Sequence, residues 1–195
     1  MEERNNLYPV FLKLEELDTL IVGGGNVGLE KLNALLKSSP AARITLVAAA
    51  IRDEIRTLAA KVKTIRLEER NFRARDLYNK DLVVLATDNP QLHARIKNLA
   101  RKRHLLVNVA DTPDLCDFYL GSVVTKGNLK IGISTNGKSP TIAKRIREYL
   151  EEALPEDTDL LLKNMQKIRQ RMKGDFADKV KMLNDLTSSW LKRTP

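Results

Sequence analysis

The sequence predicts an α/β protein built around a doubly wound parallel sheet, and two observations indicate this class. Strand-like apolar runs alternate with segments of helical periodicity through the first two-thirds of the 195 residues. Such alternation is typical of a parallel sheet with helices on both faces. A glycine-rich segment, Gly23-x-Gly25-x-x-Gly28, also stands between an apolar run and a helical pattern. A strand, a tight turn and a helix are therefore expected there.

Strands and helices are expected in alternation up to residue 109. The expected strands cover residues 10–14, 19–22, 43–47, 62–67, 81–86 and 105–109. The first expected helix follows the glycine motif and ends near residue 38, and two more cover residues 51–61 and 90–102. Within the strand expected at 81–86, residues 82–86 are continuously apolar, as in a strand buried on both faces. Ligands of such sheets bind beyond the carboxyl ends of the strands. Three strand ends are therefore of interest, at residues 23–25, 87–88 and 110–111.

The pattern changes after Pro113. Residues 122–125 and 129–134 flank a short turn that contains Gly127, which predicts a hairpin. Ser139 followed by Pro140 is a helix start signal, and the helix should cover residues 141–152. From residue 156 onward two apolar stripes predict helices that are separated at Gly174 and Asp175.

These patterns divide the chain into a nucleotide-binding domain over residues 1–113, a small α+β region over 114–152 and a C-terminal helical region over 153–195. A hairpin with one helix buries too little surface to be stable alone. We therefore expect the middle region to be a dimerisation region, and the protein to be a homodimer.

The glycine motif predicts a Rossmann-type dinucleotide site. Gly23 would permit the tight turn, Gly25 would let the backbone approach a pyrophosphate, and Gly28 would allow close packing of the helix on the strand. Free N–H groups at the helix start would receive the phosphate charge. The alternative is a glycine-rich turn that serves packing alone. The expected cofactor-binding residues are Gly23, Gly24, Gly25, Asn26, Val27, Gly28, Ala49, Ala50, Thr87 and Asp88.

The net charge of +9 favours a polyanionic ligand. A nucleic acid is not favoured, because the basic residues are dispersed among acidic ones and only 5% of residues are aromatic. No apolar run is long enough to span a bilayer, and the first residues do not resemble a signal peptide. The single cysteine, Cys116, fits a reducing compartment. We expect a cytoplasmic protein without a nucleic-acid or membrane partner.

With these motifs in place, the chain resembles the precorrin-2 dehydrogenases of sirohaem synthesis, some of which are also sirohydrochlorin ferrochelatases. The resemblance rests on Tyr-Pro-Val-Phe-Leu-Lys-Leu at residues 8–14, Val-Gly-Gly-Gly-Asn-Val-Gly at 22–28, Ala-Thr-Asp-Asn at 86–89, Val-Asn-Val-Ala-Asp-Thr-Pro at 107–113 and Ile-Ser-Thr-Asn-Gly-Lys-Ser-Pro at 133–140. It implies an oxidoreductase of the sirohaem synthase N-terminal type. Such an enzyme oxidises precorrin-2 to sirohydrochlorin, with NAD as the hydride acceptor and a polycarboxylate tetrapyrrole as substrate.

The resemblance also implies roles for individual residues. Asp111 matches the aspartate proposed as general base in this family; the alternative is a carboxylate that caps the turn before Pro113. Thr135, Lys138 and Ser139 match positions near the tetrapyrrole site. Asn136 stands where relatives carry glycine, which changes the expected loop geometry. Further basic candidates for binding substrate carboxylates are Lys126, Lys144 and Arg145.

Several alternatives stay open at this point. The acid that binds the ribose of NAD in many Rossmann proteins is replaced by Ala50, and Arg52 leaves NADP possible. His93 and His104 could be metal ligands for iron insertion, although surface histidines are favoured, and the metal site is unknown. Cys116 is favoured as a small, buried or half-buried residue. A nucleotide-sensing regulator is the alternative from a different class of protein.

Overall fold

The computed structural model describes residues 4–172 and 175–188. The chain forms two compact units. The first comprises Met1–Gly121 and Ser134–Ser139, and the second comprises Ser122–Ile133 and Pro140–Pro195. The predicted domain boundaries at residues 113 and 152 stay a prediction.

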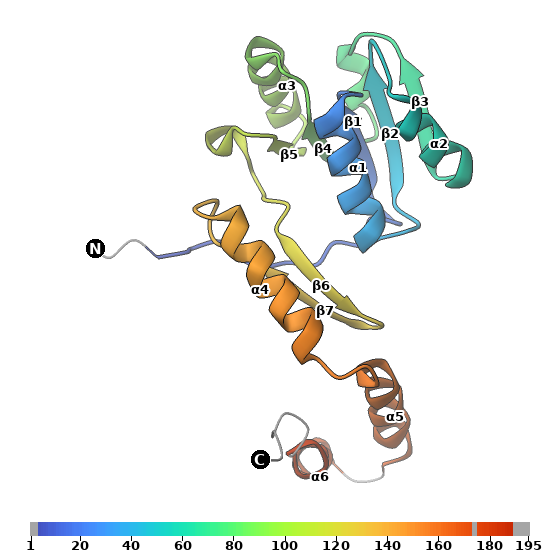
Figure 1. The fold of residues 1–195 in the computed structure, drawn as a ribbon, viewed down its shortest axis with the longest axis vertical. Helices are drawn as coiled ribbons and strands as arrows, with labels where there is room; N and C mark the ends of the chain where they lie inside the picture. Colours follow the sequence, from blue (N-terminus) through green and yellow to red (C-terminus); the bar gives the residue numbers. More distant parts are fainter. Residues whose placement is uncertain (1–3, 173–174, 189–195) are drawn as a thin grey trace. The chain divides into compact units, whose positions relative to one another are not determined.

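Five parallel strands form the sheet of the first unit, in the order β3-β2-β1-β4-β5 (Figure 1). The strands are β1 (Asp18–Val22), β2 (Arg43–Ala48), β3 (Ile65–Glu69), β4 (Leu82–Leu85) and β5 (Leu106–Val109). The chain runs outward from β1 to β3 and then returns to place β4 beside β1. This strand order confirms the predicted Rossmann-type class. Its reversal between β1 and β4 creates the point at which such sheets bind ligands.

Helices cover both faces of this sheet. They are α1 (Asn26–Ser38), α2 (Asp53–Lys61) and α3 (Pro90–Arg101). Ile21 of β1 lies in one buried cluster with Leu32 of α1 and Ile55 of α2. Its neighbour Leu20 lies in another cluster, with Ile96 of α3. Successive residues of a strand point to opposite faces, so the two clusters are the two halves of a doubly wound core. Each fully buried side chain of this size contributes about 1.5–3 kcal/mol.

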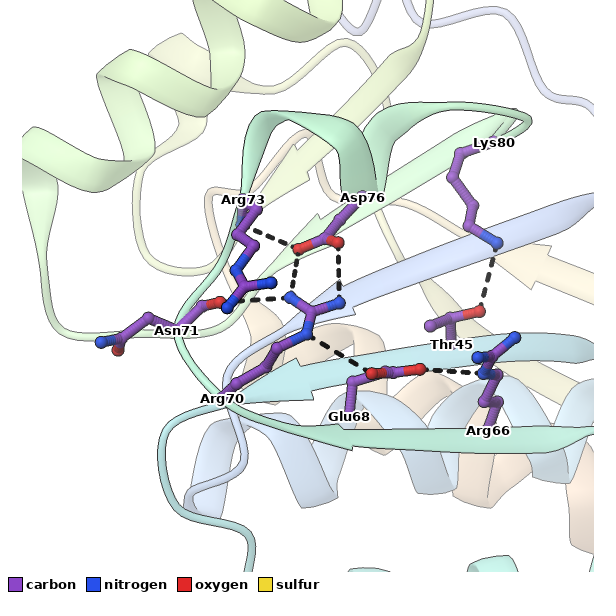
Figure 2. Close-up of polar contacts among 8 residues, drawn as sticks. All are labelled: Thr45, Arg66, Glu68, Arg70, Asn71, Arg73, Asp76 and Lys80. Carbon is purple, nitrogen blue, oxygen red and sulfur yellow. Dashed lines mark hydrogen bonds and ion pairs between the residues drawn. The ribbon is translucent and has the colours of Figure 1, made fainter.

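A partly buried ion pair fixes the connection from β3 to β4, which includes the short helix η1 (Ala74–Leu77) (Figure 2). Arg70 donates two hydrogen bonds of 2.9 Å to the carboxylate of Asp76, whose side chain is 6% exposed. The backbone N–H of Arg73 donates a third, at 2.8 Å. Burial acts to raise the pKa of Asp76, but the hydrogen bonds from Arg70 and Arg73 outweigh it and lower the pKa.

The prediction of a strand at residues 10–14 is wrong. This segment makes no strand pairing in the described part of the chain, and Val10 and Phe11 are 61% and 70% exposed. An apolar run favours a strand, but a strand also needs a partner at the sheet edge. The third strand begins at Ile65 rather than at residue 62, because the N–H of Val62 still bonds the carbonyl of Leu58 and ends α2.

The second unit begins with the predicted hairpin, formed by β6 (Ser122–Lys126) and β7 (Leu129–Ile133). The helices of this unit are α4 (Pro140–Ala153), α5 (Thr158–Arg171) and α6 (Phe176–Thr187). Ala143 of α4 is buried, as is Val124 of the strand against which α4 packs. The helical C-terminal region agrees with the prediction. Asp175 caps α6, and Gly174, the other half of the expected break, lies outside the described residues.

Two side chains from elsewhere in the second unit secure the hairpin turn. Asp159 of α5 accepts hydrogen bonds from the backbone and side chain of Asn128, at 2.8 and 2.7 Å. It also pairs with Lys163 at 2.6 Å, and these contacts lower its pKa to about 2. Lys126 pairs with Glu156 at 2.5 Å. Within residues 4–172 and 175–188, no helix has the length and apolar character needed to cross a membrane.

Candidate active site

Three glycines of the turn after β1 are required by close packing. Gly23 has φ +125°, and a Cβ there would lie 2.3 Å from the carbonyl oxygen of Ala86, just beyond β4. A Cβ on Gly28 would lie 2.2 Å from the carbonyl oxygen of Gly23, and one on Gly24 would lie 2.4 Å from that of Ala50. Real Cβ atoms do not approach backbone oxygens so closely. These three glycines therefore let β1, α1 and the ends of β2 and β4 meet.

Gly25 differs from the other three. A Cβ on this residue would meet no atom of the described residues within 4 Å, and the residue is exposed at the start of α1. Packing among the described residues therefore gives no reason for glycine here. Open space in front of a helix start is what a bound pyrophosphate requires, and a Cβ would project into that space. The turn thus fits a dinucleotide, in the way the sequence predicts.

The N-terminus of α1 is free to bind an anion. Gly25 is the N-cap residue, no side chain in the described part of the chain caps the helix, and its first turn carries no acidic residue. The first hydrogen bond of the helix runs from the N–H of Leu29 to the carbonyl of Gly25, at 3.0 Å. By helix geometry the preceding amides, those of Asn26 and Val27 among them, have no intrahelical acceptor. These N–H groups and the helix dipole favour a phosphate at this position.

The carboxyl end of β2 lies beside the glycine turn. The backbone N–H of Arg52 donates to the carbonyl of Gly24 at 3.1 Å, and both Ala49 and Ala50 are exposed. Sequence reasoning noted Arg52 but missed its side-chain partners, Asn26 and Glu54. The sequence signal for the pairing with Glu54 was the position of two opposite charges, two residues apart, at a helix start.

The end of β4 lies against the same turn. The N–H of Ala86 donates to the carbonyl of Val22 at 2.8 Å, which extends the pairing of the two strands beyond β4. Thr87 follows and is half-buried, and Asp88 is exposed. A Cβ on Gly23 would lie 3.2 Å from the backbone nitrogen of Thr87. The structure thus brings Thr87 and Gly23 together.

His93 is buried, so the expectation of a surface histidine is wrong at this position. It is 5% exposed on α3, and its Nε2 lies 2.8 Å from the hydroxyl of Thr87. Burial is the main cause that lowers its pKa. His93, Ile96 and Ala100 share the buried side of α3. Their helical spacing in the sequence could have predicted that His93 is buried. His104 is exposed.

Asp111 follows β5 in a left-handed backbone conformation, with φ +55°. Its side chain is exposed and makes no hydrogen bond or ion pair with the described part of the chain. The turn before Pro113 is closed instead by Thr112, whose N–H and hydroxyl donate to the carbonyls of Val109 and Ala110. The contacts thus give no support to the capping alternative. Left-handed backbone in a residue other than glycine costs of order 1–3 kcal/mol and is often found at functional sites.

Cys116 lies beneath this turn and is half-buried. Its Sγ donates to the carbonyl of Val109 at 3.2 Å, and burial raises the pKa of the thiol. It is therefore a packed thiol rather than an activated one, in line with the sequence-based expectation.

The loop of residues 134–139 is closed by Thr135. Its hydroxyl donates to the carbonyl of Ser139 at 3.1 Å and accepts from the N–H of Ser139 at 3.2 Å, while the N–H of Lys138 donates to the carbonyl of Thr135. Asn136 has φ +53°. Asparagine tolerates this left-handed region better than most residues, so Asn136 adopts the conformation that a glycine would take.

The remaining basic candidates have acidic partners. Lys126 is engaged by Glu156, and both Lys144 and Arg145 pair with Glu148, at 3.8 and 3.1 Å. Among the described residues, no group of three or more His, Cys, Asp or Glu side chains could hold a metal ion. Iron insertion stays an expectation from the resemblance.

The fold and the glycine turn together define a dinucleotide-binding protein of the Rossmann type. Comparison with known proteins specifies the family further. The family model described as putative NAD(P)-binding matches residues 10–122, and the model described as sirohaem biosynthesis protein central matches residues 126–153. The chain belongs to the putative NAD(P)-binding family, whose model matches more than half of it. This membership confirms the dinucleotide site class that the glycine motif predicts and the nicotinamide cofactor that the resemblance implies.

Individual relatives agree with this assignment. The siroheme synthase of Ruthia magnifica subsp. Calyptogena magnifica is 35% identical over 90% of this chain, and that of Psychrobacter cryohalolentis is 35% identical over 95% of it. The chain spans about a third of the length of these curated relatives. Among solved structures, one titled "SirC, precorrin-2 dehydrogenase" matches with a TM-score of 0.74 and 27% identity, over 95% of this chain and 92% of that chain.

Proposed function

We propose that this protein is a precorrin-2 dehydrogenase, which oxidises precorrin-2 to sirohydrochlorin with NAD as the acceptor. The observation that carries the proposal is the exposed carboxylate of Asp111, held in a left-handed turn at the same sheet edge as the open glycine turn. The structural match to a protein of that title and the siroheme synthase relatives support it.

The sheet register supports the placement of both groups. Val22 of β1 pairs with Leu85 of β4, and Leu85 pairs with Val109 of β5, so the three strands end level with one another. Neighbouring strands lie about 4.8 Å apart, so the strand ends before the glycine turn and before Asp111 are separated by roughly 10 Å. A dinucleotide whose pyrophosphate lies at α1 can reach across β4 toward Asp111.

The proposed reaction divides between cofactor and protein. NAD supplies the hydride acceptor when bound. The protein removes the second hydrogen as a proton, and Asp111 is the group we propose to take it. Precorrin-2 then loses one hydride and one proton and becomes sirohydrochlorin, with NADH and a proton as the other products. We further propose that Thr135, Lys138 and Ser139 contact the substrate. Part of the positive net charge of the chain would then serve to bind the carboxylates of the substrate.

A homodimer is part of the proposal. Helix α4 exposes Ile146 and Tyr149, by 40% and 60%, and α6 exposes Phe176 by 79%. Large apolar side chains gathered on one small unit are typical of a surface that another protein covers. A second copy of this chain would cover them and supply the packing that a two-stranded hairpin lacks.

The Asp111→Asn variant tests the assignment of the base. Asparagine keeps the shape of the side chain and tolerates the left-handed backbone, but it accepts a proton poorly. Turnover of precorrin-2 should fall by about 10²- to 10⁴-fold, while NAD affinity and melting temperature stay close to those of the unmodified protein. A stable, fully active Asp111→Asn variant would remove Asp111 from the mechanism.

A further inference from the structure

The side chain of Arg52 lies beside the glycine turn and the start of α1. The residue follows β2, and its backbone N–H is bonded to Gly24 of the glycine turn. Its Nη1 donates to the side-chain oxygen of Asn26 at 2.6 Å, and Asn26 is the first residue of α1. The guanidinium is therefore fixed to both the turn and the helix that would hold the pyrophosphate.

Glu54 neutralises this guanidinium from its other side. Its carboxylate accepts from Nε of Arg52 at 3.2 Å and from Nη2 at 2.5 Å. Glu54 thus occupies the edge of the guanidinium that binds carboxylates and phosphates in a bidentate manner. The side chains remain 41% and 53% exposed. An exposed pair contributes little to stability, so stability alone gives little reason for the arrangement.

The position of the pair connects it with the ribose of the cofactor. In Rossmann proteins an acid at the end of the second strand binds the ribose 2′-hydroxyl of NAD, whereas a nearby arginine accommodates the 2′-phosphate of NADP. Here β2 ends in alanines, and the first charged groups beyond it are Arg52, Asp53 and Glu54. The side chain of Asp53 is 99% exposed and lies 3.8 Å from Nε of Arg56.

We propose that Glu54 sets the preference of this protein for NAD over NADP by occupying and neutralising Arg52. The inference rests on the proposed dinucleotide site. With Glu54 in place, a 2′-phosphate meets a guanidinium whose bidentate edge is filled and a carboxylate that repels it. Without the carboxylate, the same guanidinium is a ready partner for the phosphate.

The test measures the dissociation constants of NAD and NADP for the full chain by calorimetry. The unmodified protein should bind NAD at least about tenfold more tightly than NADP. Glu54→Gln should shift the ratio of the two constants toward NADP by about tenfold or more, as expected when one like charge beside a phosphate is removed. The double variant Glu54→Gln, Arg52→Ala should lose that gain, because the phosphate partner is gone.

A matched control is available in the second unit. Arg147 donates to both carboxylate oxygens of Glu151, at 2.9 and 2.7 Å, so Glu151→Gln removes the same charge from a similar pair. Its NAD-to-NADP ratio should equal that of the unmodified protein. If Glu54→Gln leaves the ratio unchanged while NAD still binds, the inference about Glu54 is overturned and the dinucleotide site stands. If the unmodified protein binds neither dinucleotide, the proposed function itself fails.

Discussion

Nε2 of His93 lies 2.8 Å from the hydroxyl of Thr87, so a buried imidazole holds a side chain at the carboxyl end of β4. This bond joins the inner face of α3 to the sheet edge at which the dinucleotide is proposed to bind. Thr87 is one of the expected cofactor-binding residues, which makes His93 a candidate positioning residue.

The pH dependence of folding should report this histidine. Burial lowers the pKa of His93 in the folded state below its ordinary value of about 6.5. The unfolded chain therefore binds a proton more readily, and stability falls as the pH drops below about 6.5 toward the folded-state pKa. His93→Gln, which keeps a hydrogen-bonding group but does not titrate, should remove this part of the pH dependence. Urea unfolding of both proteins between pH 5 and 8 measures it, and identical pH profiles would contradict the assignment.

The glycines at positions 25 and 28 should respond differently to substitution. Gly25→Val adds carbons to space that is open in the chain, so it should weaken NAD binding by at least about tenfold with little loss of stability. Gly28→Ala places a Cβ 2.2 Å from the carbonyl oxygen of Gly23, and the resulting overpacking should cost about 1–3 kcal/mol of unfolding free energy. Calorimetry with NAD and chemical denaturation of each variant separate the two effects. Unchanged NAD affinity in a folded Gly25→Val variant would exclude the proposed pyrophosphate position.

The proposed dimer can be tested on α4. Sedimentation of the full chain at micromolar concentration should give a dimer. Tyr149→Glu places a charge on the exposed apolar face and should shift the equilibrium toward monomer, whereas Lys144→Glu, which changes an already polar position on the same helix, should shift it much less. A monomeric unmodified protein, or equal behaviour of the two variants, would contradict the proposal.

Local sequence patterns predicted the fold class and the glycine turn well. The fold class followed from alternating periodicities, and the turn at residues 23–28 followed from the position of its glycines between a strand and a helix. Both depend on residues that are close in the sequence. The error at residues 10–14 has the opposite origin, because a strand forms only if another strand lies beside it, and no local pattern encodes that partner.

The parts of the site that escaped sequence reasoning depend on tertiary contacts. Helical spacing could have placed His93 on the buried side of α3, but its contact with Thr87 depends on how the helix packs against the sheet. The contact between Arg52 and Asn26 joins residues 26 positions apart, and the left-handed backbone of Asp111 is set by the turn beyond β5. The family resemblance pointed to Asp111, but its open surroundings are visible only in the folded chain.

The most direct test of the account is to mix the purified full chain with NAD and precorrin-2 without oxygen, and to follow NADH and sirohydrochlorin together by absorbance. The account predicts that both products appear at the same rate and in equal amounts, and that omission of either protein or NAD stops the reaction. A folded protein that binds NAD but forms neither product from precorrin-2 would contradict it.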